Sequence, residues 1–265
     1  MQTNNIEILP VGSGKASRNI AVNHQQGKEP GIFWLSGFKS DMSGTKAVEL
    51  AQWAGDQGVA CTRFDYSGHG LSDGEFVEGC LSDWLEESLA VFSQYCRGRT
   101  ILVGSSMGGW LALLLVRALA RNPGCHNAQI SGLLLIAPAV DFSHELIWKH
   151  LTKDLKNQLE EKGHFLRPSA YSDDPYVVTK KLIDDGRRHL LMGSQMEVGC
   201  PVQVLQGTKD ESVPLDHVMR MVELMPKDDV TVTLVRDGDH RLSSPEDIQR
   251  LKRLVAQMLD AHLPG

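Results

Sequence analysis

Short apolar segments alternate with helical segments along most of the 265-residue chain, and this alternation constrains the fold more than any other feature. Buried strands are expected at residues 31–35, 59–64, 100–103, 130–136, 201–205 and 230–235. Between them, apolar residues recur at helical spacing over residues 45–57, 81–95, 107–121 and 218–225. This order of elements is typical of a parallel sheet that is covered by helices on both faces, so the sequence predicts an α/β fold.

Both ends of the chain add elements to this pattern. Residues 6–9 and 18–23 predict an opening antiparallel pair of strands. The last helix is expected to begin after Ser244 as N-cap, with Pro245 in the first turn and Asp247 three residues after the cap.

One stretch interrupts the alternation, because no apolar strand recurs between about residues 142 and 199 and the charge density rises there. Residues 144–162 place Ile147, Leu151, Leu155 and Leu159 on one stripe, which predicts an amphipathic helix. A loop is expected at residues 167–175 and a second helix at 179–191. We therefore expect a core of residues 1–142 and 200–265, and a cap insertion of residues 143–199 over a pocket. A solvated, charged insertion is the alternative.

Charge and composition exclude several classes of partner. The formal net charge is −6 and basic residues do not cluster, which argues against nucleic acid as a partner. The longest apolar run, residues 110–120, contains Arg117 and is far shorter than the roughly 20 residues of a membrane span. The first residues resemble neither a signal nor a transit peptide, and the five cysteines are odd in number with no C-x-x-C. These features predict reduced thiols and a cytoplasmic location.

The pattern G-x-S-x-G occurs twice, and its context distinguishes the two matches. Ser106 lies between the expected strand at 100–103 and the expected helix at 107–121, whereas Ser72 lies in a polar loop. A strand, a sharp turn and a helix expose a serine at the carboxyl edge of a sheet. Ser106 is therefore the predicted nucleophile, with the N-terminus of the helix beside it.

A serine hydroxyl needs a base, and the base needs an orienting acid. Among ten histidines, His240 follows the last expected strand by a short loop. Asp210 follows the strand at 201–205, and its rivals are Asp141 after the preceding strand and Asp239 beside the histidine. The sequence predicts Ser106, His240 and Asp210 as nucleophile, base and acid.

Two backbone N–H groups are expected to hold the oxyanion. One belongs to Met107, the residue after the nucleophile, and the other to Phe38, in the loop after the strand at 31–35. Gly37 allows a close turn there. Gly37, Trp110 and Trp148 are the candidates for substrate contact.

No metal, nucleotide or other cofactor is expected, because the sequence holds no H-E-x-x-H motif, Walker loop or dinucleotide fingerprint.

Four stretches carry a resemblance to a known family: SGFKSDMSGTKA (36–47), RFDYSG (63–68), VGSSMGGW (103–110) and PSAYS (168–172). The chain resembles the α/β-hydrolase superfamily over essentially its whole length. Within it, the chain is similar to the branch that includes the mitochondrial palmitoyl-protein thioesterase and acyl-glucuronide esterase. The resemblance implies an α/β-hydrolase fold with a mostly parallel eight-stranded sheet and a small helical cap, and Ser106, Asp210 and His240 as a catalytic triad. Ser36 departs from the His-Gly that is common in this loop.

The expected function is hydrolysis of carboxylic esters or thioesters through an acyl-enzyme, with a small acyl ester or thioester as substrate. A C–C bond hydrolase on the same fold is one alternative, and a catalytically idle ligand-binding module is another. The oligomeric state is left open.

Overall fold

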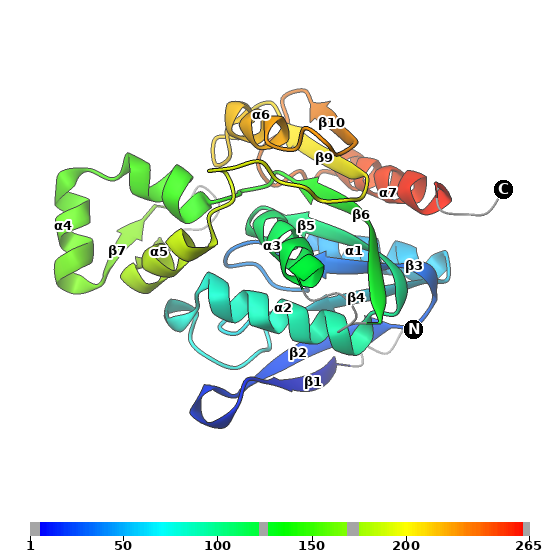
Figure 1. The fold of residues 1–265 in the computed structure, drawn as a ribbon, viewed down its shortest axis with the longest axis horizontal. Helices are drawn as coiled ribbons and strands as arrows, with labels where there is room; N and C mark the ends of the chain where they lie inside the picture. Colours follow the sequence, from blue (N-terminus) through cyan, green and yellow to red (C-terminus); the bar gives the residue numbers. More distant parts are fainter. Residues whose placement is uncertain (1–5, 122–126, 169–174, 262–265) are drawn as a thin grey trace.

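The computed structural model describes residues 6–121, 127–168 and 175–261. Eight strands form one sheet in the order β1-β2-β4-β3-β5-β6-β9-β10 (Figure 1). From β4 to β10 all neighbours are parallel, whereas β1 and β2 pair antiparallel with each other and β2 with β4. The strands are β1 (Ile6–Val11), β2 (Arg18–Gln25), β3 (Lys28–Leu35), β4 (Val59–Phe64), β5 (Gly98–Ser105), β6 (Ala128–Ile136), β9 (Val202–Gly207) and β10 (Val230–Val235).

Helices cover both faces of this sheet, because alternate residues of the central strands point to opposite sides. Phe33 and Leu35 of β3 belong to one apolar cluster, and Ile32 and Trp34 belong to another. The first cluster includes the buried faces of α2 (Leu81–Tyr95), α3 (Met107–Arg121) and α6 (Leu215–Glu223). The second includes those of α1 (Thr45–Asp56) and α7 (Pro245–Asp260). The predicted two-faced α/β architecture is confirmed.

The last helix begins as its sequence predicts. Ser244 Oγ accepts the N–H of Asp247 at 3.2 Å, and Asp247 Oδ2 accepts the N–H of Ser244 at 3.2 Å. This reciprocal capping box fixes the start of α7 directly after the loop that carries His240.

The segment between β6 and β9 differs from its prediction. The single helix expected at 144–162 is broken into a π-helical turn (Ser143–Ile147), a 3₁₀ turn (Trp148–His150) and α4 (Lys153–Lys162). Leu151 is extended, with ψ 135°, and Thr152 caps α4 by accepting the N–H of Leu155 at 3.3 Å. The spacing of the apolar residues continues through the break and does not reveal it. The signal that does mark it is Thr152, a residue type that favours the N-cap of a new helix.

Two short strands also lie where no strand was expected. β7 (His164–Arg167) pairs antiparallel with β8 (Tyr176–Thr179), and both are only four residues long. The second helix predicted for this segment is α5 (Lys180–Gly186), which is followed by a 3₁₀ turn (Arg187–His189). Most of the loop expected at 167–175 lies outside the described residues. Figure 1 shows α4, β7 and α5 together at one side of the core. In the described ranges, no helix combines the length and apolarity needed to cross a bilayer.

Candidate active site

Ser106 sits on a strained turn between β5 and α3, with φ +55°. The neighbouring glycines make this turn sterically allowed. A Cβ added at Gly104 would lie 2.3 Å from the carbonyl oxygen of Gly108, and one added at Gly108 would lie 2.0 Å from that of Leu35. The Ser106 N–H donates to the carbonyl of Ile136 at 2.8 Å, which anchors the turn to β6. The G-x-S-x-G pattern therefore builds a turn that presents Ser106 at the carboxyl edge of the sheet.

The structure brings Ser106, His240 and Asp210 together, although they come from three different loops. His240 Nε2 lies 3.0 Å from Ser106 Oγ, and His240 Nδ1 lies 2.8 Å from Asp210 Oδ2. A carboxylate only accepts hydrogen bonds, so the Nδ1 atom carries the proton and Nε2 faces the serine as an acceptor. This is the chain of contacts that activates a serine.

Asp210 is held rigidly in its orienting position. Its side chain is fully buried, and Oδ1 accepts the N–H groups of Ser212 at 2.9 Å and Val213 at 2.8 Å. Because those two bonds fix Oδ1, the second oxygen is left to face His240. The turn after β9 thus aims the carboxylate before any substrate arrives.

The two rival acids have other partners. Asp141 accepts the N–H groups of Leu191 and Met192, and burial raises its pKa from 3.8 to about 6. Asp239 Oδ1 accepts the N–H of Leu242 at 3.0 Å. These bonds give both residues structural roles in their own loops.

Ser72, the serine of the second G-x-S-x-G match, ties its loop to β2. Its Oγ donates to the carbonyl of Asp65 at 2.6 Å and accepts the N–H of Ala21 at 2.8 Å. Its hydroxyl therefore links the loop to the sheet through two hydrogen bonds.

Phe38 and Met107 line the same cavity as Ser106. Within the described ranges, neither backbone N–H is bonded to an acceptor. A Cβ added at Gly37 would come within 3.3 Å of the Ser105 carbonyl oxygen, so a residue without a side chain suits the close approach of this loop to the nucleophile. Unbonded backbone N–H groups near a nucleophile are the donors that an oxyanion hole requires.

The cavity over Ser106 has a volume of about 510 Å³. Part of its wall is apolar and is formed by Phe38, Ala139, Phe142, Leu146, Ile147, Val178 and Val213. Charged side chains also line it, namely Lys39, Lys46, Arg167, Glu211 and Arg241. Burial lowers the pKa of Lys46 to about 8 and also lowers the pKa of Arg167. Lys39 follows Phe38 directly in the chain, and Arg167 is the last residue of β7.

Trp110 and Trp148, the predicted substrate contacts, do not line this cavity. Trp110 is fully buried, and its Nε1–H donates to the carbonyl of His189 at 3.4 Å. Trp148 lies between Lys156 Nζ, 4.9 Å from its ring centroid, and the guanidinium of Arg187, at 4.2 Å. Trp110 misses the cavity because its ring belongs to the buried core, and Trp148 misses it because its ring packs against Lys156 and Arg187.

Only one residue of that predicted stripe reaches the cavity. Ile147 lines it, whereas Leu151, Leu155 and Leu159 do not. Its neighbour Leu146, which was not on the stripe, does line it.

Comparison with known proteins identifies the family. A family model described as "Serine aminopeptidase, S33" (Hydrolase_4) matches residues 32–247. The chain belongs to this family. It is 37% identical over 245 residues to the mitochondrial palmitoyl-protein thioesterase ABHD10 of Homo sapiens, which covers 91% of this chain and 77% of that protein.

Solved structures give the same result. The crystal structure of a protein from Agrobacterium vitis S4 superposes with a TM-score of 0.93 at 44% identity, covering 96% of this chain and 98% of that one. Alpha/beta hydrolase domain-containing protein 10 from mouse superposes with a TM-score of 0.83 at 32% identity, covering 96% and 99%. The predictions of an α/β-hydrolase fold, of this branch and of an ester or thioester hydrolase are confirmed, and neither alternative function is favoured.

The prediction of a cytoplasmic location is wrong. Curated relatives that are 35% to 37% identical to the chain are named mitochondrial proteins. The prediction rested on the first residues and on the cysteine pattern, and both are only indirect indicators of a compartment.

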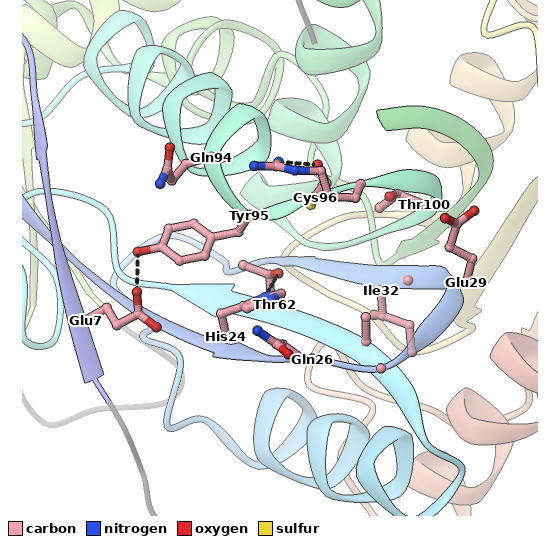
Figure 2. Close-up of a pocket in the computed structure, with 14 residues that line it drawn as sticks. Glu7, His24, Gln26, Glu29, Ile32, Thr62, Gln94, Tyr95, Cys96 and Thr100 are labelled. Carbon is pink, nitrogen blue, oxygen red and sulfur yellow. Dashed lines mark hydrogen bonds between the residues drawn. The ribbon is translucent and has the colours of Figure 1, made fainter. Parts of the chain in front are cut away.

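A second cavity lies at the edge of the sheet opposite Ser106 and has a volume of about 470 Å³ (Figure 2). There the Tyr95 hydroxyl donates to Glu7 Oε2 at 3.0 Å, and His24 Nδ1 lies 2.9 Å from Thr62 Oγ1. Cys96 also lines it, but burial raises the pKa of its thiol to about 12, so it is not a thiolate nucleophile. The described part of the chain holds no cluster of His, Cys, Asp and Glu suited to a metal ion. The carboxyl edge therefore carries the arrangement suited to hydrolysis.

Proposed function

We propose that the chain hydrolyses acyl thioesters and esters, with Ser106 as nucleophile, His240 as general base and acid, and Asp210 as the orienting acid. The observation that carries this proposal is the relay of 3.0 Å and 2.8 Å contacts from Ser106 Oγ through the imidazole to the buried carboxylate. The three groups belong to one hydrogen-bonded unit, as nucleophilic catalysis requires.

Acylation uses each of these contacts. Ser106 Oγ attacks the carbonyl carbon while its proton passes to His240 Nε2, and the carbonyl oxygen becomes an oxyanion. The N–H groups of Phe38 and Met107 stabilise that charge. The C–S or C–O bond then breaks, the leaving group takes the proton from His240, and the acyl group remains on Ser106.

Deacylation repeats the same steps with water. His240 removes a proton from the water, and the hydroxide adds to the acyl carbon. The second tetrahedral intermediate then collapses as His240 returns the proton to Ser106 Oγ, which releases the carboxylic acid and regenerates Ser106. Asp210 stabilises the imidazolium in both half-reactions.

The substrate class follows from the cavity and the relatives. The apolar wall of Phe142, Leu146, Ile147, Val178 and Val213 suits an acyl chain, whose burial contributes about 0.8 kcal/mol per methylene. The curated relatives are named palmitoyl-protein thioesterases. Residues 143–199 would act as a cap that supplies part of this wall, while residues 1–142 and 200–265 form the catalytic core.

A comparison of two serine variants tests the proposal. Purified wild type, Ser106→Ala and Ser72→Ala are assayed with p-nitrophenyl esters and acyl-thioesters, and each is treated with a fluorophosphonate probe. We expect Ser106→Ala to lose about 10⁴- to 10⁶-fold in kcat and all labelling, since members of a triad act as a unit. Labelling of Ser106→Ala at the wild-type rate would show that another residue is the nucleophile.

A further inference from the structure

The loop that carries Phe38 is a tight turn in an unfavourable conformation. The N–H of Ser40 donates to the carbonyl of Gly37 at 3.1 Å, which closes a turn over residues 37–40. Its third residue, Lys39, has φ +56°. Glycine usually occupies this position, because a side chain at positive φ crowds the backbone and costs about 1–2 kcal/mol. A contact from outside the turn must therefore stabilise the peptide between Phe38 and Lys39.

His69 makes that contact. The N–H of Lys39 donates to Nε2 of His69 at 3.2 Å, and the other ring nitrogen, Nδ1, lies 3.1 Å from the carbonyl oxygen of Ser67. A carbonyl only accepts, so Nδ1 carries the proton and Nε2 is a bare acceptor. The geometry thus fixes the tautomer as well as the partner.

The surroundings hold the ring of His69 in this orientation. The residue is 5% exposed, and its ring lies edge-on to Phe76, Trp84 and Tyr66 at centroid distances of 5.2, 5.3 and 5.7 Å. Burial lowers the pKa of His69, while the Ser67 carbonyl and the charge of Asp41 oppose that effect. A neutral imidazole keeps Nε2 available to Lys39.

Phe38 shares two of these neighbours. Its ring centroid lies 4.8 Å from that of Phe76 and 6.2 Å from that of Trp84. The ring of Phe38 and the peptide that follows it are therefore fixed by the same group of side chains.

We propose that His69 is a positioning residue for the oxyanion-binding loop. Its Nε2 fixes the peptide between Phe38 and Lys39 and so stabilises the turn. The bond from Ser40 N–H to the Gly37 carbonyl then orients the preceding peptide, which carries the Phe38 N–H. This inference rests on the proposed function, in which that N–H binds the oxyanion. His69 does not touch the substrate, and it acts through Lys39.

Two substitutions separate the two hydrogen bonds of His69. In His69→Gln, the longer side chain can place its carbonyl oxygen near the position of Nε2 and accept the Lys39 N–H, but it gives up the bond to Ser67. In His69→Asn, the shorter amide can donate to the Ser67 carbonyl, but it does not reach Lys39. Each variant loses one hydrogen bond, so a merely structural role predicts similar effects of both on kcat.

We expect His69→Asn to lower kcat for p-nitrophenyl acetate about 10- to 100-fold with little change in KM, somewhat less than removal of a whole oxyanion donor. We expect His69→Gln to stay within about 3-fold of wild type. His24→Asn, at the opposite edge of the sheet, is the matched control and should leave kcat unchanged. Equal losses in His69→Asn and His69→Gln, or no loss in either, would overturn the inference.

A double-mutant cycle with Lys39→Gly provides a second measurement, of the link through Lys39. Glycine adopts positive φ without strain, so the turn should need its external acceptor less. In the Lys39→Gly background we expect His69→Asn to cost less than 3-fold in kcat, and an undiminished loss would overturn the link through Lys39. Wild type and Ser106→Ala are assayed first, because the absence of Ser106-dependent turnover would refute the proposed function and not the role of His69.

Discussion

The carboxylate of Asp141 accepts the backbone N–H of Leu191 with both oxygens, at 2.9 and 3.0 Å, across 50 positions of the chain. Oδ2 also accepts the N–H of Met192 at 2.8 Å. Asp141 comes shortly after β6, and Leu191 lies where the chain returns from α5. One buried side chain therefore joins the two ends of the segment that contains α4, β7, β8 and α5.

This junction predicts a pH dependence of stability. Burial raises the pKa of Asp141 from 3.8 to about 6, and the nearby charge of Glu145 adds to that rise. Between about pH 4 and pH 6 the folded protein therefore binds a proton that the unfolded chain has released. The unfolding free energy should fall as the pH rises through this window, by on the order of 3 kcal/mol, and change no further above it.

Asp141→Asn isolates this contribution from the other titrating groups. Its unfolding free energy, measured by urea denaturation at several pH values, should lack the part of the slope between pH 4 and pH 6 that Asp141 supplies. Parallel pH curves for wild type and variant would contradict the assignment.

Asp141→Asn also serves as the control for Asp210→Asn, the substitution of the proposed catalytic acid. In Asp210→Asn, the side-chain oxygen must stay at the Oδ1 position, where it accepts the N–H groups of Ser212 and Val213. The amide NH₂ then faces His240 Nδ1 and favours the tautomer with a proton on Nε2, which cannot accept the proton of Ser106. We expect kcat to fall by about 10⁴, as in the protease case of the same change.

Asp141→Asn should keep kcat within a few-fold of wild type, because its partners lie in the chain that returns from α5. Steady-state kinetics with a p-nitrophenyl ester at pH 8 compares the two variants. A crippled Asp141→Asn beside a near-normal Asp210→Asn would move the acid to the loop after β6.

Ser72→Ala should change stability and leave catalysis intact. Ser72 Oγ is the acceptor for the N–H of Ala21, which is fully buried in β2. Its loss leaves that N–H unsatisfied and should reduce the unfolding free energy by about 1–3 kcal/mol. Thermal unfolding measures this loss, and kcat/KM should equal that of wild type. Unchanged thermal stability would show that water or another group replaces the hydroxyl.

The hydrogen-bonded arrangement of Ser106, His240 and Asp210 could be predicted because its signals are local and strong. A buried strand ending at Val103, a G-x-S-x-G turn and an apolar helix from Met107 place the nucleophile. The loops after two later strands then leave few choices for Asp210 and His240. Parallel strands bring all three loops to one edge of the sheet, so the order of elements was sufficient.

The segment between β6 and β9 could not be predicted in the same way. The stripe from Ile147 to Leu159 has helical spacing, yet the helix breaks at Leu151 and Thr152. β7 and β8 are four residues each and stabilise one another, so neither carries a pattern of its own. His69 was overlooked for a different reason: its partner is the backbone N–H of Lys39, and a backbone group leaves no mark in the sequence.

The acyl preference should therefore depend on the π-helical turn and not on the half-buried Trp148. Leu146 and Ile147 line the cavity, whereas Trp148 packs between Lys156 and Arg187 outside it. For wild type, kcat/KM across a series of p-nitrophenyl esters should rise by up to about 4-fold per methylene, since each buried methylene contributes about 0.8 kcal/mol, and then fall once the cavity is full.

Leu146→Ala widens the cavity and should move the optimum of that series toward longer acyl chains, with little effect on acetate esters. Trp148→Ala is the matched control, because it removes a large apolar side chain from the same turn region without opening the cavity. Its acyl profile should coincide with that of wild type. A shift of the optimum in Trp148→Ala, with none in Leu146→Ala, would show that the acyl chain is bound on the other side of this turn.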